Sequence, residues 1–181
     1  SLGAAVSQSA AGRPLGEIIT GIDEATAQAC FVDLDGLDVA LANPTGAPLA
    51  IVSALPHGRS AETLAMVLAR EAVAAREVFV CDLAADFRHA DPARFAALYG
   101  QTHGAPGLLP RFHCALPDLG PDAPGAWFAH PGCFTTAVVL AAAPLFAADL
   151  VEGRFVANCV TGSTGSGRRP GAGTHHPERH S

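Results

Sequence analysis

The chain has 181 residues, 49% of them hydrophobic, which is enough apolar side chain to fill the core of one ordinary domain or slightly more. Its formal net charge of −6, without a basic stripe, argues against nucleic-acid binding. The apolar run Ala137–Leu145 is too short for a bilayer span of about 20 residues, and the N-terminus lacks a signal-peptide pattern. We therefore expect a soluble, cytoplasmic protein with no membrane and no nucleic-acid partner.

The first predicted elements are two strands and the loops that follow them. Leu2–Val6 is typical of the end of a strand, and the polar segment Ser7–Gly16 then forms a loop that can face a ligand. The apolar run Leu49–Leu55 is typical of a buried parallel strand, and Pro56–Gly58 predicts a tight turn after it.

Alternating helices and strands follow. Ser60 is predicted to cap a helix over about Ala61–Ala75, and Val78–Asp82 reads as the next strand. Asp91 and Pro92 are typical of a helix start, with the helix ending near Tyr99 before a glycine.

The last part of the chain is less regular. Gly104–Gly125 is rich in proline and predicts an irregular segment that joins two domains, followed by a strand over Ala126–Ala129 and an apolar helix over Cys133–Ala148. Arg154–Thr161 alternates like a strand, and Gly162–Gly173 predicts a loop. The strand–helix alternation and the low aromatic content of 6% favour an α/β fold with a buried parallel sheet.

The five cysteines, at positions 30, 81, 114, 133 and 159, include no Cys-x-x-Cys pair, which argues against both a disulfide framework and a cysteine zinc site. Cys81 and Cys159 lie in strand-like runs and are predicted to pack as small hydrophobic residues. His175, His176 and His180 lie close together, but no His-Glu-x-x-His pattern is present, so an unstructured end is favoured over a metal site.

Cys133 stands where a predicted strand meets a predicted helix, in the segment His130–Thr136. The unpaired N–H groups of a helix's first turn favour the thiolate, which is the form that attacks electrophiles. The alternative is that Cys133 is a small apolar residue packed at a helix start, and position alone does not separate the two.

Two other segments carry groups suited to binding. Thr161–Pro170 combines glycines, hydroxyls and two adjacent arginines, which suit a phosphate or a cofactor edge, although a flexible linker is the alternative. Asp82–Arg88 places two carboxylates and an arginine after a strand, at the end of a sheet where ligands bind; alternatively, Asp86 and Arg88 pair with each other.

Six segments of the chain carry the motifs of one known family in the family's order. They are Ala54–Gly58 (Ala-Leu-Pro-His-Gly), Asp82–Arg88 (Asp-Leu-Ala-Ala-Asp-Phe-Arg), Tyr99–His103, Cys114–Asp118, His130–Ala137 (His-Pro-Gly-Cys-Phe-Thr-Thr-Ala) and Thr161–Pro170. Together they resemble the N-acetyl-gamma-glutamyl-phosphate reductases of the semialdehyde dehydrogenase superfamily. The family's first strand with its Gly-rich dinucleotide loop would precede Ser1, and its catalytic base would follow Ser181.

The resemblance implies an incomplete Rossmann-type NADP-binding domain over residues 1–131 and the start of an α+β catalytic and dimerisation domain over residues 132–181. It implies Cys133 as the nucleophile and no metal. Contacts to NADP are implied for Ser7, Ser9, Arg13, Leu55, Pro56, Gly165 and Gly167. Contacts to the substrate or its phosphate are implied for Arg88, Ser163 and Arg168, with a role in local structure as the alternative for Arg88.

The implied reaction is the NADPH-dependent reduction of N-acetyl-gamma-glutamyl phosphate to N-acetylglutamate semialdehyde, through a cysteine thioester, in arginine biosynthesis. One alternative is the reduction of a carrier-linked aminoadipyl phosphate in lysine biosynthesis, and another is a nucleotide-binding remnant without catalysis. We expect a small-molecule acyl-phosphate substrate and a homo-oligomer. Because half of the pyrophosphate site and the base lie outside it, the 181-residue piece alone is expected to have little or no activity.

Overall fold

The computed structural model describes residues 2–42, 47–119 and 126–162. The chain divides into two compact units, Ser1–Gly132 and Cys133–Ser181. The assignment of a cofactor domain to residues 1–131 and of a catalytic domain to residues 132–181 stays a prediction.

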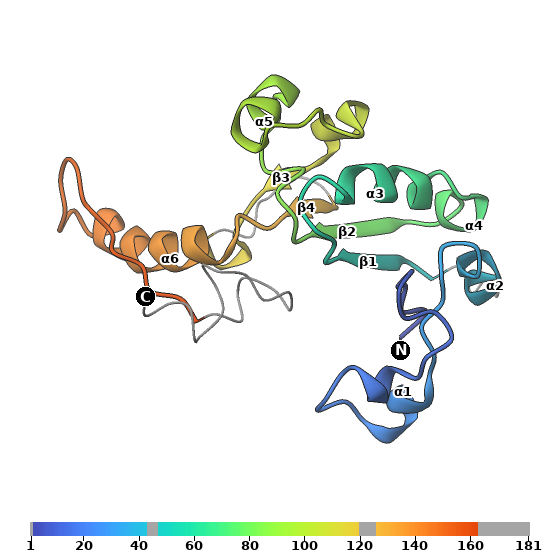
Figure 1. Ribbon diagram of the computed structural model, residues 1–181. Helices are drawn as coiled ribbons and strands as arrows, with labels where there is room; N and C mark the ends of the chain where they lie inside the picture. Colours follow the sequence, from blue (N-terminus) through green and yellow to red (C-terminus); the bar gives the residue numbers. More distant parts are fainter. Residues whose placement is uncertain (1, 43–46, 120–125, 163–181) are drawn as a thin grey trace, which may run out of the picture. The chain divides into compact units, whose positions relative to one another are not determined.

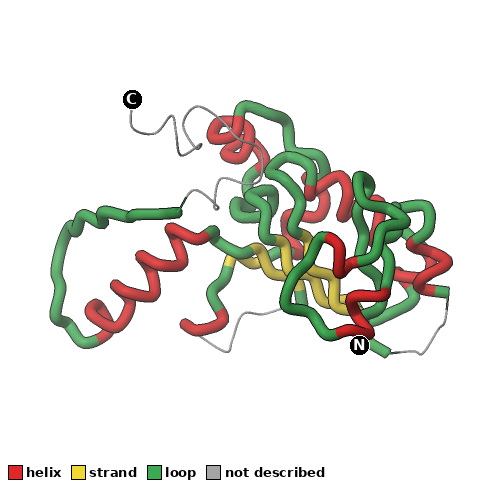
Figure 2. The backbone as a smooth tube through the Cα atoms, turned by 60° about the horizontal axis from the view of Figure 1, so that its bottom comes forward, coloured by secondary structure: helices red, strands yellow, loops and turns green. Residues whose placement is uncertain are grey.

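Four parallel strands form the sheet of the first unit, in the order β1-β2-β4-β3 (Figures 1 and 2). They are β1 (Leu49–Ser53), β2 (Val78–Asp82), β4 (Trp127–Ala129) and the two-residue β3 (His113–Cys114). The register sets Ser53 opposite Asp82 and Asp82 opposite Ala129. The last residues of β1, β2 and β4 therefore lie together at one edge of the sheet, its carboxyl edge.

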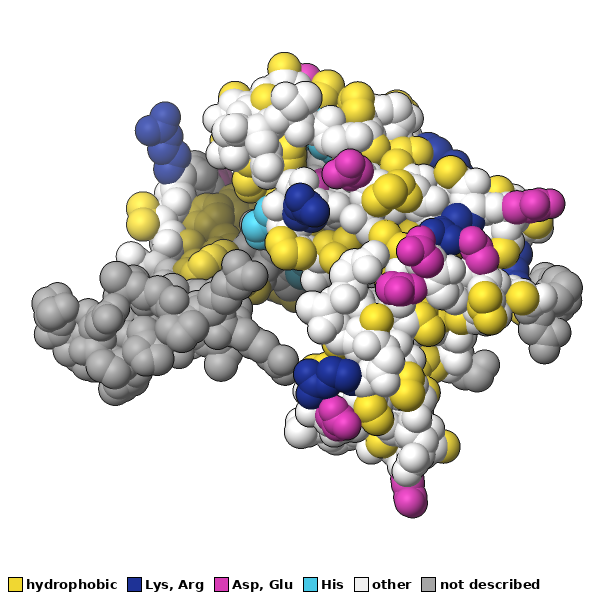
Figure 3. Space-filling model, turned by 45° about the vertical axis from the view of Figure 1, so that its right-hand side comes forward, with side chains coloured by type: hydrophobic (Ala, Val, Ile, Leu, Met, Phe, Trp, Pro, Cys, Tyr) yellow, Lys and Arg dark blue, Asp and Glu magenta, His cyan; other side chains and the backbone are white. Residues whose placement is uncertain are grey.

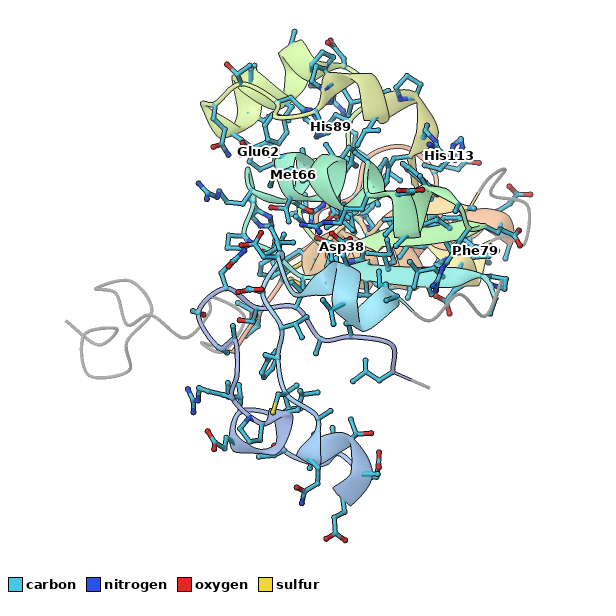
Figure 4. All side chains as sticks on the ribbon, turned by 90° about the vertical axis from the view of Figure 1, so that its right-hand side faces the viewer. Asp38, Glu62, Met66, Phe79, His89 and His113 are labelled. Atoms are coloured by element: carbon cyan, nitrogen blue, oxygen red, sulfur yellow. The ribbon has the colours of Figure 1, made fainter. Side chains whose placement is uncertain are left out.

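Two short helices, α3 (Ser60–Leu68) and α4 (Glu71–Ala74), connect β1 to β2 and lie against the sheet (Figure 1). The sequence predicts one helix here, but Arg70 takes an extended conformation (φ −68°, ψ 137°) and separates the two. Leu64 and Val67 face the core, whereas Met66 on the outer side of α3 is 49% exposed (Figure 4). This apolar spacing is what the helical period requires of a helix that covers a sheet.

The core consists of two apolar clusters. One lies between α3, the sheet and the segment after α5, and includes Ala61, Leu64, Val80, Phe87, Leu109, Phe112, Trp127 and Ala129. The other joins Leu37, Leu41, Val67 and Val73. Phe87 stacks on Phe112 with ring centroids 3.8 Å apart, and the indole Nε1–H of Trp127 donates to Val78 O at 2.9 Å. Burial of these rings fixes the long proline-rich segment onto the sheet.

The remaining elements are short except for one helix of the second unit. In the first unit they are the 3-10 helices η1 (Leu15–Glu17), η2 (Pro106–Arg111) and η3 (Pro117–Leu119) and the α-helices α1 (Glu24–Gln28), α2 (Leu37–Leu41) and α5 (Pro92–Tyr99). The second unit contains α6 (Cys133–Ala147). The predicted caps of α5 are confirmed, because Asp91 accepts a hydrogen bond from Ala93 N at 2.8 Å and Gly100 closes the helix with φ 68°.

Besides the single helix over Ala61–Ala75, four expectations from the sequence are wrong. Leu2–Val6 is not a strand, since only an isolated bridge joins Val6 to Val32. Arg154–Thr161 has no regular structure, because a polar–apolar alternation makes a strand only where a neighbouring strand accepts its hydrogen bonds. Cys159, which lies in this segment, is exposed rather than packed as a small hydrophobic residue. Ser60 is the first residue of α3 rather than its N-cap.

No helix in the described ranges is long and apolar enough to span a membrane. On the face drawn in Figure 3, acidic and basic side chains are intermingled.

Candidate functional site at the carboxyl edge of the sheet

The turn after β1 is exposed but firmly held. Leu55, Pro56 and His57 are exposed at the end of the strand, Leu55 by 38%, and Gly58 turns the chain with φ 79°. The ring nitrogen His57 Nδ1 accepts a hydrogen bond from Ala85 N at 3.0 Å, which ties the turn to the loop that follows β2. The apolar side chain of Leu55 is thus kept exposed at the carboxyl edge of the sheet, where ligands of parallel sheets bind.

Asp86 is the second tie between these two loops. It is 1% exposed, and its carboxylate accepts from Gly58 N at 2.8 Å and from Ala61 N at 3.0 Å. The negative charge therefore lies at the N-terminus of α3, where unpaired backbone N–H groups need acceptors. Asp86 does not pair with Arg88, so that alternative from the sequence is wrong.

Asp82 ends β2 and is completely buried. Its Oδ1 accepts from the hydroxyl of Ser60 at 2.6 Å, and the hydroxyl of Ser53 lies 2.6 Å from that of Ser60. Among the described residues, Oδ2 has no hydrogen-bond partner. Burial raises the pKa of the Asp82 carboxyl, and the hydrogen bond from Ser60 opposes this effect only in part.

This raised pKa predicts a pH-dependent stability. Below pH 3.8, the pKa of this carboxyl in the unfolded chain, Asp82 is neutral in both the folded and the unfolded state, and its contribution to stability is complete. As the pH rises through the higher pKa of the folded state, ionisation in the buried site removes this contribution. Asp82→Asn, neutral at every pH, is expected to gain stability relative to the wild type as the pH rises from 4 to 7. Urea unfolding followed by the fluorescence of Trp127, the single tryptophan of the chain, measures the difference. A difference independent of pH would contradict the prediction.

The guanidinium of Arg88 lies between the loop after β2 and the turn that precedes α6. Its Nε donates to His130 O at 2.9 Å and its Nη2 donates to Leu83 O at 3.2 Å. Two of its nitrogens thus bind backbone carbonyls, and the role of Arg88 in substrate binding stays a prediction.

Cys133 is exposed in the first position of the 15-residue α6. In the second unit a groove of about 640 Å³ runs between α6 and the segment 155–161, and Cys133 and Phe134 are among the residues that line it. The predicted transition from strand to helix near Cys133 is confirmed, because β4 ends at Ala129 and α6 begins at Cys133. The nucleophilic role of Cys133 stays a prediction, supported by its exposure.

Two of the other cysteines, Cys81 and Cys114, are less suited to react. Burial raises the pKa of the thiols of Cys81 and Cys114, which leaves less thiolate at neutral pH. For Cys114 the charge of Arg88 opposes this effect.

The remaining predicted site residues fall into two groups. Ser7, Ser9 and Arg13 lie in a loop that pairs with residues 30–32 through Ser7 N to Val32 O at 2.9 Å and Phe31 N to Arg13 O at 3.0 Å. Arg13 also forms an exposed ion pair with Glu17. The second group, Ser163, Gly165, Gly167 and Arg168, lies outside the described residues, as do His175, His176 and His180.

Sequence reasoning missed the structural roles of three residues at this edge: His57, Asp86 and His103. His103 is 4% exposed, accepts from Ala105 N at Nδ1, and therefore donates from Nε2 to Asp86 O at 2.8 Å. For Asp86 the available signal was a polar residue between apolar neighbours, in Ala85-Asp86-Phe87, because a polar group buried in such a segment needs partners.

Comparison with known proteins adds independent information. The family model described as semialdehyde dehydrogenase, dimerisation domain, matches residues 133–181. An N-acetyl-gamma-glutamyl-phosphate reductase of Nitrosococcus oceani is 34% identical over 180 residues, covering 94% of this chain and 47% of that protein.

Another relative carries a different name. A putative [LysW]-L-2-aminoadipate 6-phosphate reductase of Thermomicrobium roseum is 37% identical over 133 residues, or 71% of this chain and 36% of that protein. An N-acetyl-gamma-glutamyl-phosphate reductase of Alkalilimnicola ehrlichii is 40% identical over 124 residues, or 67% of this chain and 34% of that protein. The chain spans less than half the length of these relatives.

Proposed function

Because this chain belongs to the semialdehyde dehydrogenase superfamily, we propose that it is part of an NADP-dependent acyl-phosphate reductase that reduces N-acetyl-gamma-glutamyl phosphate in arginine biosynthesis. The observation that carries the proposal is the exposed thiol of Cys133 at the start of α6, directly after the strand and turn that end the parallel sheet. An exposed thiol at this position is accessible to an electrophile.

In the proposed reaction the Cys133 thiolate attacks the acyl carbon of the substrate, and the C–O bond to phosphate breaks. The products of this step are inorganic phosphate and a thioester on Cys133. NADPH, when bound by the residues assigned to it, would supply the hydride that reduces the thioester to a hemithioacetal. Cleavage of the C–S bond then releases the semialdehyde and regenerates the thiol, with the proton supplied by a general acid.

The carboxyl edge of the sheet fits the dinucleotide. Ligands of parallel sheets bind outside the carboxyl ends of the strands, and the exposed turn with Leu55 and Pro56 lies at this edge. We assign to these residues, together with Ser7, Ser9, Arg13, Gly165 and Gly167, the contacts to NADP. Ser163 and Arg168 are assigned to the substrate and its phosphate, and a homo-oligomer is proposed to form through the dimerisation segment.

A second substrate is supported by the relatives named for [LysW]-aminoadipate phosphate. A reductase of this kind acts on the same chemical group, an acyl phosphate, but on a substrate attached to a carrier protein. The net charge of −6 of these 181 residues disfavours an acidic carrier, because the two would repel each other.

The test is an assay of the full-length protein in the reverse direction, as phosphate-dependent reduction of NADP⁺. N-acetylglutamate semialdehyde is expected to be oxidised, and the carrier-linked aminoadipate semialdehyde is expected to be inert. Turnover only with the carrier-linked substrate would replace the proposed substrate. A folded protein that binds NADP⁺ but oxidises neither aldehyde would overturn the proposed function.

A further inference from the structure

Arg88 joins two segments that are distant in the sequence. It belongs to the loop after β2, and its guanidinium bonds the carbonyl of Leu83 in that loop and the carbonyl of His130 in the turn after β4. His130 is itself fixed to β2, because its N–H donates to Asp82 O at 2.8 Å. The three residues 130–132 lead directly into Cys133.

The absence of a side chain at Gly132 lets the guanidinium of Arg88 lie close to the backbone of the turn. A Cβ added at position 132 would lie 3.1 Å from Nη2 and 3.2 Å from Nη1 of Arg88, and the φ of Gly132 is +99°, a value that side chains other than glycine's rarely adopt. The N–H of Gly132 donates to His130 Nδ1 at 3.1 Å. The turn is therefore held by its own histidine on one side and by Arg88 on the other.

The positive charge of Arg88 has no carboxylate partner among the described residues. Its nearest acidic neighbour along the loop, Asp86, is occupied by the N–H groups of Gly58 and Ala61. An arginine that binds two carbonyl oxygens and no carboxylate fixes backbone geometry, since its planar fork orients both acceptors at once.

We propose that Arg88 is a positioning residue, which holds the His130–Gly132 turn so that the thiol of Cys133 is presented for attack. This inference rests on the proposed role of Cys133 and differs from the substrate contact that the family resemblance implies for Arg88. A positioning residue changes the rate of the reaction on bound substrate, whereas a substrate ligand changes binding.

The experiment uses the full-length protein with Arg88→Ala and Arg88→Lys, and with Arg94→Ala, an exposed arginine of α5, as the matched control. Arg88→Ala is expected to lower kcat by roughly 10²-fold, the scale for a misplaced reacting group, with little change in KM. Arg88→Lys keeps the positive charge but not the planar guanidinium that binds two carbonyl oxygens, so it is expected to recover only part of the kcat lost in Arg88→Ala. A higher KM with unchanged kcat would overturn the proposal and favour a substrate ligand.

A second readout does not need the reductase reaction. The rate at which iodoacetamide alkylates Cys133, followed by peptide mass spectrometry, is expected to fall several-fold in Arg88→Ala and to be restored by added guanidinium. Unchanged alkylation in a folded Arg88→Ala protein would overturn the positioning role. If the wild type lacks reductase activity, the proposed function fails, and the alkylation rates still decide the role of Arg88.

Gly132→Ala gives an independent check of the same geometry. The added methyl group is expected to displace the guanidinium and to lower kcat and alkylation as Arg88→Ala does. In the double variant Gly132→Ala/Arg88→Ala the two losses are expected to be less than additive, because the clash is removed with the guanidinium. Fully additive losses would contradict the contact between the two residues.

Discussion

Replacing Cys133 by serine in the full-length protein is expected to abolish phosphate-dependent NADP⁺ reduction while leaving the fold intact. Serine occupies nearly the same volume, but its hydroxyl is ionised far less readily than a thiol near neutral pH, so the covalent step is lost. Because this residue would form the thioester itself, the fall in kcat is expected to span several orders of magnitude. The measurement is the reverse assay with N-acetylglutamate semialdehyde, together with dinucleotide binding as a test of folding.

Cys114→Ser is the matched control for this experiment. Cys114 is also exposed, but it lies in β3 and partial burial raises the pKa of its thiol. Its replacement is expected to leave kcat within a factor of two of the wild type, a factor that corresponds to about 0.4 kcal/mol. If Cys133→Ser retained activity, or if both variants lost it equally, Cys133 would not be the nucleophile.

The elements that the sequence predicted well are those with strong local signals. β1, β2 and β4 lie within their predicted ranges, and α6 spans Cys133–Ala147 against the predicted Cys133–Ala148. Continuous apolar runs suffice for such elements, because the length of the run predicts a short strand or a longer helix without knowledge of a distant partner.

The failures share a different cause, which is dependence on a distant partner. The two residues of β3 form a strand only because β4 lies beside them, and Arg154–Thr161 alternates without any ladder partner in the described ranges. The site shows the same limit: Ser60 bonds Asp82, 22 positions away, and Asp86 reaches back to Gly58. Local patterns predicted the positions of polar groups but not their hydrogen-bond partners.

Asp86→Ala is expected to be among the most destabilising single replacements in the first unit. The carboxylate is the acceptor for two backbone N–H groups, of Gly58 and Ala61, and it is buried. Leaving a buried donor without a partner costs about 1–3 kcal/mol, so the loss of both acceptors is expected to lower the free energy of unfolding by roughly 2–6 kcal/mol. Urea unfolding of the chain, followed by Trp127 fluorescence, measures this loss.

Two further variants separate the hydrogen bonds from other effects of the replacement. Asp86→Asn keeps one acceptor oxygen and is expected to lose less stability than Asp86→Ala, whereas Asp118→Ala, at an exposed aspartate of η3, is expected to change it by less than about 0.5 kcal/mol. The hydrogen bonds of Asp86 also fix the turn that exposes Leu55 and Pro56. Asp86→Asn is therefore also expected to weaken dinucleotide binding by the full-length protein. Wild-type stability in Asp86→Ala would mean that the Gly58 and Ala61 N–H groups find other acceptors, and the turn would not depend on this carboxylate.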